Sequence, residues 1–335
     1  MIVKKQADRE KILLTTRRNY LKAMAAGAIT LGTGWAHAQD KSPIRILSAG
    51  AAGSGSDFTV RAIADRMREK LDRPVVVEIK PGVGQRVAIG ELLRAKPDGR
   101  TLLFFTDSAF TLSPHIYRNV GYDAVRDFTP VAGIGTFDMG VATGPMTSAA
   151  DMRKCIEWLL ANRDNAFYGT PGTGSLPQFI GVELGNAINV KMQHVPYKDW
   201  NMAVSDLISG RIPLLIHGLS TMLEMHRARK LRIVAVTGDA RSPLVPDVPT
   251  LRESGVPVTS VVRMGIMGPS AMPQDLVSSL NGIIMDAAKG AAFRDSIAKY
   301  GVLPSPSSAS ELAQALATES QRLQRLVKAS GHEPE

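Results

Sequence analysis

Apolar and polar positions alternate with two different periods along the chain after residue 43. Residues 44–49 form a short apolar run that predicts a strand, and apolar residues in 57–71 recur every three or four positions, which predicts an amphipathic helix. The alternation continues with a strand over 75–79, a helix over 87–95 and a strand over 101–106. This strand–helix–strand spacing predicts parallel strands in a doubly wound sheet.

A second group of strands follows further along the chain. The expected strands are 137–142, 166–169, 192–195, 214–217 and 231–237, with helices between them. A proline-rich turn passage over 241–257 leads to one more strand over 261–267. Helices are then expected over 273–289, 291–300 and 308–329.

Two strand groups predict an α/β protein with two lobes and a doubly wound sheet in each lobe. We expect the chain to cross between the lobes near 131–138 and again near 240–263. The last segment would then return to the first lobe. The predicted domains are lobe 1 over 39–135 plus 256–335, and lobe 2 over 136–255.

The first 38 residues have the features of an export signal. Arg17-Arg18 lies in a sequence that resembles the twin-arginine consensus, and a mild apolar run over 23–35 leads to Ala36-His37-Ala38, a small-residue cleavage site. The run is too short and too rich in glycine and alanine to span a bilayer. We expect a twin-arginine-type signal peptide over 1–38 and a periplasmic protein after cleavage.

The signal also explains much of the basic charge. The 335-residue chain has a formal charge of +9, but seven basic and two acidic residues lie in 1–38, so the remainder carries +4. These charges are scattered and form no basic block, which argues against a nucleic-acid partner. Cys155 is the only cysteine, which excludes an intrachain disulfide, and its helical spacing with apolar neighbours predicts a buried, inert thiol.

Three loops rich in small residues follow predicted strands, at 49–57, 106–109 and 169–175. Ligands in open α/β sheets bind outside the carboxyl ends of the strands, where small residues leave backbone N–H groups accessible. Any one of these loops is explained as well by a tight turn. Together they predict donors for a carboxylate or phosphate in one cleft, whereas Asp57 is expected to cap the following helix.

Motifs for catalysis are missing from the sequence. It contains neither a phosphate-binding loop, nor a complete dinucleotide fingerprint, nor a G-x-S-x-G nucleophile elbow. The histidines after the signal are isolated from one another, without metal-ligand spacing. His194 and His217 end apolar strands and could face the cleft, although a structural role is the simpler interpretation. We therefore predict no catalytic residue, no metal and no cofactor.

Several sequence blocks, in order over 43–330, together resemble the Bug/TctC solute receptors of tripartite tricarboxylate transporters. The blocks are AAGSGSD (51–57), PGVG (81–84), PDGRTLLF (97–104), YDAVRDFTPVA (122–132), GTPGTGS (169–175), HVPYK (194–198), SDLISGRI (205–212) and RSPLVPDVPTLRESG (241–255). The chain departs from the family pattern at Ala49-Gly50, Gly84-Gln85, Gln178-Phe179, Asp199 and Arg263, several of them in or near the predicted cleft.

The resemblance implies a type II periplasmic-binding-protein fold, in which two lobes close on a ligand like a venus flytrap. It also implies that backbone N–H groups and ordered waters, rather than an arginine clamp, hold a carboxylate. Three further residues, from the second-lobe blocks, would bind the ligand or brace the loops. The ligand loops carried over by position are Ala51, Ala52, Gly53, Ser54 and Ser56, then Ser108 and Ala109, then Thr173, Gly174 and Ser175; the three further residues are His194, Tyr197 and Asp206.

Three functions fit these observations. The first is a monomeric receptor that passes a small carboxylate to the membrane subunits of a tripartite transporter. A second is a sensor module that reports ligand occupancy to a membrane partner such as a sensor kinase. The third is a secreted enzyme on the same scaffold, which turnover of a bound compound would reveal. The sequence favours the first, and it leaves the identity of the ligand open.

Overall fold

In the computed structural model, residues 42–50 and 52–334 are described, so the signal peptide predicted over 1–38 lies outside them. The strands are β1 (Ile44–Ser48), β2 (Val75–Ile79), β3 (Thr101–Thr106), β4 (Phe128–Thr143), β5 (Phe167–Thr170), β6 (Gln193–Pro196), β7 (Leu214–Gly218), β8 (Arg232–Val236), β9 (Val261–Pro269) and β10 (Val302–Ser307). The helices are α2 (Gly55–Leu71), α3 (Arg86–Leu92), α4 (Ser108–Thr111), α5 (Ser113–Ile116), α6 (Met152–Ala161), α7 (Leu176–Ala187), α8 (Trp200–Ile208), α9 (Leu219–Arg227), α10 (Gln274–Lys289), α11 (Ala291–Ala298) and α12 (Ala309–Ala329), with 3₁₀ turns η1 (Val83–Gln85) and η2 (Arg163–Asn165).

The strands follow one path, β2-β1-β3-β9-β4-β7-β5-β6, with β10 and β8 also paired to β4. We call β1, β2, β3, β9, β10 and the first part of β4 the first half-sheet. The second part of β4 with β5, β6, β7 and β8 forms the second half-sheet. Strands β1, β2 and β3 are mutually parallel, as are β5, β6 and β7, which confirms the parallel pairing that the sequence predicts.

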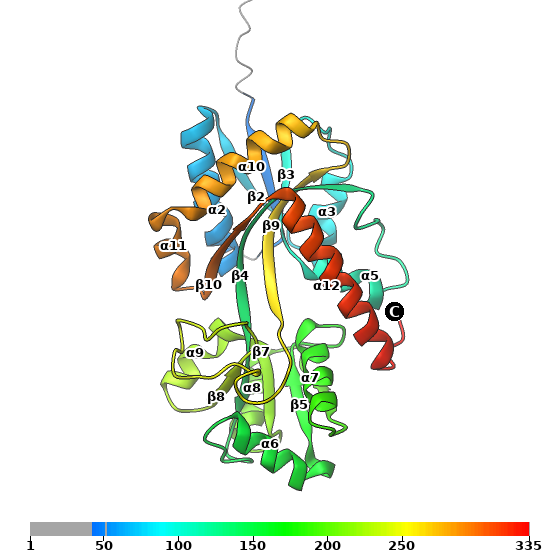
Figure 1. The fold of residues 1–335 in the computed structure, drawn as a ribbon, viewed down its shortest axis with the longest axis vertical. Coiled ribbons are helices and arrows are strands. Elements are labelled where there is room, and N and C mark those ends of the chain that lie inside the picture. Colours follow the sequence, from blue (N-terminus) through cyan, green and yellow to red (C-terminus); the bar gives the residue numbers. More distant parts are fainter. Residues whose placement is uncertain (1–41, 51, 335) are drawn as a thin grey trace, which may run out of the picture. The chain divides into compact units, whose positions relative to one another are not determined.

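Strands β4 and β9 connect the two half-sheets and break the parallel pattern (Figure 1). The chain leaves the first half-sheet along β4 and returns along β9, so the two strands run in opposite directions and pair antiparallel. Strand β9 is also antiparallel to β3, because β3 runs in the direction of β4. The predicted lobe boundary near residue 136 falls inside the continuous strand β4, and the division into lobes at that residue stays a prediction.

The first part of β4 and the whole of β10 were not predicted from the sequence. In β4 the register shifts between Pro130 and Ala132 and again between Gly133 and Gly135, and these bulges interrupt the two-residue alternation on which the prediction depends. Strand β10 contains Pro304, a residue that sequence patterns treat as a strand breaker. Pairing with β4 stabilises this edge strand nonetheless.

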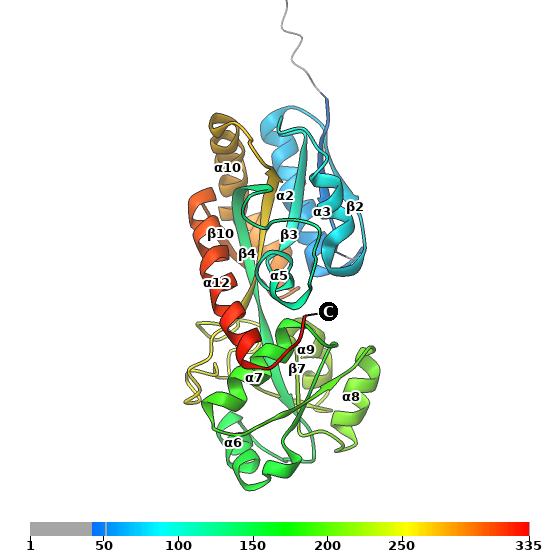
Figure 2. The same cartoon turned by 90° about the vertical axis from the view of Figure 1, so that its right-hand side faces the viewer.

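Helix α12 packs against both half-sheets (Figure 2). Near its start, Leu312 and Leu316 join the apolar cluster around α3 and β3. Near its end, Leu323 and Leu326 join the cluster that contains α6 and α7 of the second half-sheet. Cys155 lies in that second cluster, fully buried, which confirms the predicted buried thiol, and burial raises its pKa to about 11.

Candidate functional site

A pocket of about 290 Å³ lies between the two half-sheets. Its walls come from η1, the end of β3, α4, α5 and the start of α7, together with the connecting strands β4 and β9. The lining residues are Gly84, Gln85, Thr106, Ser108, Ala109, Leu112, Ser113, Ile116, Tyr117, Phe137, Met139, Gly174, Ser175, Leu176, Pro177 and Val262. We call this the cleft pocket.

Two of the three predicted loops meet in the cleft pocket. Ser108 and Ala109 from the first half-sheet and Gly174 and Ser175 from the second line it together. Ala51 lies outside the described residues. The other predicted ligand residues that the structure describes do not line this pocket; they are Ala52, Gly53, Ser54, Ser56, Thr173, His194, Tyr197 and Asp206.

The first predicted loop is organised around the start of α2. Ser54, not Asp57, is the N-cap, and its side chain accepts a hydrogen bond from Asp57 N at 3.3 Å. The helix begins two residues earlier than the sequence suggested, which moves Asp57 into its first turn. There the carboxylate accepts hydrogen bonds from Gly53 N at 2.9 Å and from Arg61 Nε at 2.8 Å. Asp57 therefore stabilises the helix start, as predicted, from a different position.

Gln85 holds the second loop in place, although sequence patterns indicated no functional role for it. Its side-chain amide donates to the carbonyl oxygen of Thr106 at 2.9 Å and to Thr106 Oγ1 at 2.8 Å, and its oxygen accepts from Thr106 N at 3.2 Å. Gln85 has a φ of 67°, a left-handed conformation that favours glycine. The signal for this residue was in the sequence, because Gln85 stands where the family pattern has glycine.

The third loop is fixed by side chains behind it. Gly174 N donates to Gln178 Oε1 at 2.7 Å, and Ser175 Oγ donates to the carbonyl oxygen of Gly172 at 2.8 Å. His194 Nε2 lies 2.6 Å from Thr170 Oγ1, at the end of β5. His194 thus braces this loop, and burial lowers the pKa of its imidazole to about 4.

Tyr197 and Asp206 pair with each other. The Tyr197 hydroxyl donates to Asp206 Oδ2 at 2.8 Å, and Arg211 Nη1 donates to Asp206 Oδ1 at 2.8 Å. The bonds to Arg211 and Tyr197 lower the pKa of the Asp206 carboxyl, so it is ionised at neutral pH. This arrangement matches the bracing alternative from the sequence rather than direct contact with a ligand in the cleft pocket.

Asp107 lies between two residues that line the pocket and is itself only 2% exposed. Burial raises the pKa of its carboxyl to about 7, against the opposing influence of Arg263. Asp107 Oδ2 has no hydrogen-bond partner among the described residues, since Arg263 Nη1 is 3.6 Å away. A buried acid with a raised pKa thus lies in the chain between two lining residues of the cleft pocket.

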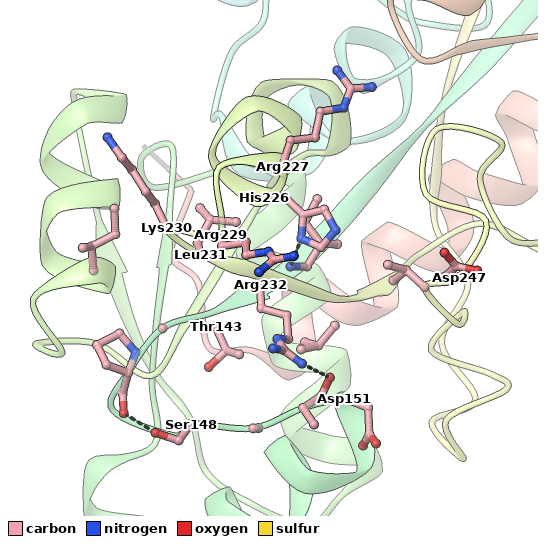
Figure 3. A pocket seen from close by; sticks show the side chains of 18 of the residues that line it. Thr143, Ser148, Asp151, His226, Arg227, Arg229, Lys230, Leu231, Arg232 and Asp247 are labelled. Atoms are coloured by element: carbon pink, nitrogen blue, oxygen red, sulfur yellow. Dashed lines mark hydrogen bonds between the residues drawn. The ribbon is translucent and has the colours of Figure 1, made fainter.

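A larger groove of about 940 Å³ lies in the second half-sheet (Figure 3). Arg227, Arg229, Lys230 and Arg232 give it a basic lining, with Asp151 and Asp247 among the other residues. Arg232 donates to the carbonyl oxygen of Ala150 at 3.1 Å. All its residues lie between 143 and 249, so this groove lacks the first half-sheet as a second wall and differs from an interlobe site.

The family model described as "Tripartite tricarboxylate transporter family receptor" matches residues 59–332. This chain belongs to that family. A UPF0065 protein from Bordetella bronchiseptica is 30% identical over 265 residues, which cover 79% of this chain and 78% of the relative. The family consists of solute receptors rather than enzymes, which confirms the prediction of a non-enzymatic binding protein.

Solved structures show the same fold. A structure described as that of a periplasmic transporter has 30% identity and a TM-score of 0.72, and the match covers 87% of this chain and 98% of that one. An R. palustris protein solved with adipate has 24% identity and a TM-score of 0.74, with coverage of 88% and 99%, and supports the fold alone. The two-lobed type II fold predicted from the sequence is thereby confirmed. Within the described part of the chain, we find no helix with the length and apolarity that crossing a membrane requires.

Proposed function

We propose that this protein is a periplasmic receptor that binds a small carboxylate in the cleft pocket and delivers it to the membrane subunits of a tripartite transporter. The observation that carries the proposal is that Ser108 and Ala109 line one pocket together with Gly174 and Ser175. The two pairs come from different half-sheets, so a ligand between them would contact both lobes. The chain belongs to a family of tripartite tricarboxylate transporter receptors, which supports a carboxylate as the ligand class.

The lining of the cleft pocket offers neutral groups to an anion. None of its lining side chains carries a charge. The twelve-residue helix α7 begins directly after Ser175, and the positive end of its dipole therefore points toward the pocket. The Ser108 hydroxyl adds a neutral donor, whereas the Ser175 hydroxyl already donates to the carbonyl oxygen of Gly172.

Closure of the lobes would follow from binding to both of them. In the proposed mechanism the strands β4 and β9 bend where they pass between the half-sheets, and the ligand favours the closed state because only that state completes its contacts. The register shifts of β4 against β9 lie between Pro130 and Gly135, on the side of the first half-sheet, and another against β8 lies between Val141 and Ala142 in the second. We expect the monomer to perform this movement alone.

Thermal unfolding with a panel of organic anions tests the binding step. A ligand at one hundred times its Kd stabilises the folded state by about 2.7 kcal/mol, which is a clear upward shift of the melting temperature. Ser108→Phe should fill the pocket and remove the shift. Ser279→Phe is the matched control, because Ser279 is exposed on α10. If no anion in the panel raises the melting temperature of the wild type or of the control variant, the result contradicts the receptor function.

Uptake measurements test the transport step. Cells that contain the tripartite membrane subunits should accumulate the radiolabelled ligand only when the wild-type receptor is present, and Ser108→Phe should abolish accumulation. Binding without any effect on uptake contradicts the transporter role and favours the sensor alternative.

A further inference from the structure

Arg86 carries a charge without an acidic partner among the residues that the structure describes. It is the first residue of α3, and its Nε is buried without a hydrogen-bond partner. The group that does contact it is the ring of Tyr117, whose centroid lies 4.2 Å from Arg86 Cζ. An aromatic face attracts a cation but does not neutralise it. The described residues therefore leave the positive charge of the guanidinium without a compensating negative charge.

This charge lies at the edge of the cleft pocket. Gly84 and Tyr117 both line the pocket, and Arg86 Nε is 3.9 Å from the position that a Cβ on Gly84 would occupy. Gln85 also lines the pocket and fixes this segment to Thr106. Arg86 does not itself line the pocket, but its side chain lies against two residues that do, Gly84 and Tyr117, so its charge is close enough to act on an anion bound there.

The pocket wall itself is mainly apolar. Among the polar lining side chains, Gln85 and Thr106 already satisfy each other and Ser175 Oγ donates to the carbonyl oxygen of Gly172. This leaves the hydroxyl groups of Ser108, Ser113 and Tyr117. A ligand with an apolar body gains free energy by removing such a surface from water. The large apolar side chains that line it are Leu112, Ile116, Phe137, Met139, Leu176 and Val262.

We propose that the pocket selects a monocarboxylate with an apolar body, such as an aryl carboxylate, and that Arg86 is the residue that attracts its negative charge. This inference rests on the proposed receptor function and adds to it the ligand class and a specificity-determining residue. A small dicarboxylate would place its second charge against apolar side chains, where the loss of hydration is costly.

Isothermal titration calorimetry with three probes tests the proposal. Phenylacetate carries one charge on an aryl body, phenylacetamide has the same shape without the charge, and malate has two charges and no apolar body. The wild type should bind phenylacetate at least about tenfold more tightly than either of the other two, which corresponds to about 1.4 kcal/mol. Arg86→Met should reduce the affinity for phenylacetate to nearly that for phenylacetamide. Arg86→Lys should keep part of the preference for phenylacetate.

Arg94→Met is the matched control, because Arg94 is exposed just after the same helix. It should leave all three affinities unchanged. Two results overturn the inference: a wild type that prefers malate, or an Arg86→Met variant that keeps the full preference for phenylacetate over phenylacetamide. In both cases the receptor function survives. A wild type that binds no anion in the wider panel overturns the receptor function itself. Should Arg86→Met fail to fold, Arg86→Gln provides the same comparison.

Discussion

The buried Asp107 and the partly exposed Arg263 form a contact that joins two strands without a side-chain hydrogen bond. Asp107 Oδ2 lies 3.6 Å from Arg263 Nη1, while Asp107 N donates to the carbonyl oxygen of Arg263 at 2.9 Å. The pair links the end of β3 to β9, the strand along which the chain returns from the second half-sheet. A buried carboxylate oxygen that lacks a hydrogen bond should make stability depend on pH.

Asp107→Asn should become more stable than the wild type as the pH rises. The folded-state pKa of about 7 lies above the value of about 3.9 that an unfolded aspartate has. The folded state therefore holds the proton more tightly, and wild-type stability falls between about pH 4 and pH 7, by on the order of 4 kcal/mol in total. Urea unfolding at pH 5 and pH 8 measures this. If the free energies of unfolding of the wild type and of Asp107→Asn differ by the same amount at both pH values, the result contradicts the prediction.

His194 should make the stability of the protein depend on pH in the opposite direction. Burial lowers the pKa of its imidazole from 6.5 to about 4, so the unfolded state binds the proton more readily between these values. The stability that the neutral imidazole contributes is present above about pH 6.5 and is lost as the pH falls toward 4. His194→Gln should flatten that part of the profile of unfolding free energy against pH. An unchanged slope would show that His194 is not the titrating group.

Replacement of Arg322 should weaken the attachment of α12 to the second half-sheet. Arg322 forms ion pairs with Glu183 of α7 and, at 2.7 Å, with Glu319 of its own helix. Arg322→Met leaves two partly buried carboxylates without their partner and should lower the free energy of unfolding by about 1–3 kcal/mol. Arg325→Met, at an exposed position on the same helix, should change it by less than about 0.5 kcal/mol. Urea denaturation compares the two variants, and equal effects contradict the prediction.

Two glycine-to-alanine changes in helices should have opposite effects on the stability of the protein. A Cβ on Gly181 of α7 would lie 2.0 Å from Cε2 of the buried Tyr168, so Gly181→Ala should cost about 1–3 kcal/mol through overpacking. A Cβ on Gly282 of α10 would meet nothing within 4 Å, so Gly282→Ala should stabilise the protein by up to about 1 kcal/mol. Melting temperatures of the two variants provide the comparison. Similar shifts in both would mean that the Tyr168 ring moves aside.

Much of this protein follows from local sequence alone. Strands β1, β2 and β3 lie within one residue of their predicted positions, because continuous apolar runs between turn residues specify strands without help from distant parts of the chain. The buried thiol of Cys155 followed from helical spacing in the same way. Ordered sequence blocks were enough to indicate the family. Two loops of the cleft, at Ser108 and Ser175, were also identified from their small residues at strand ends.

The tertiary structure decided which of these parts meet. Periodicity shows which side of an element is buried but not what that side packs against. The sequence therefore could not show that Ser108 lines the pocket whereas His194 contacts Thr170 behind a loop. It could not show that Gln85 lines the pocket or that Arg86 lies against Tyr117, because their partners Thr106 and Tyr117 lie far away along the chain. Residues in a cleft between half-sheets are brought together by chain crossings, and those depend on long-range strand pairing that no local pattern encodes.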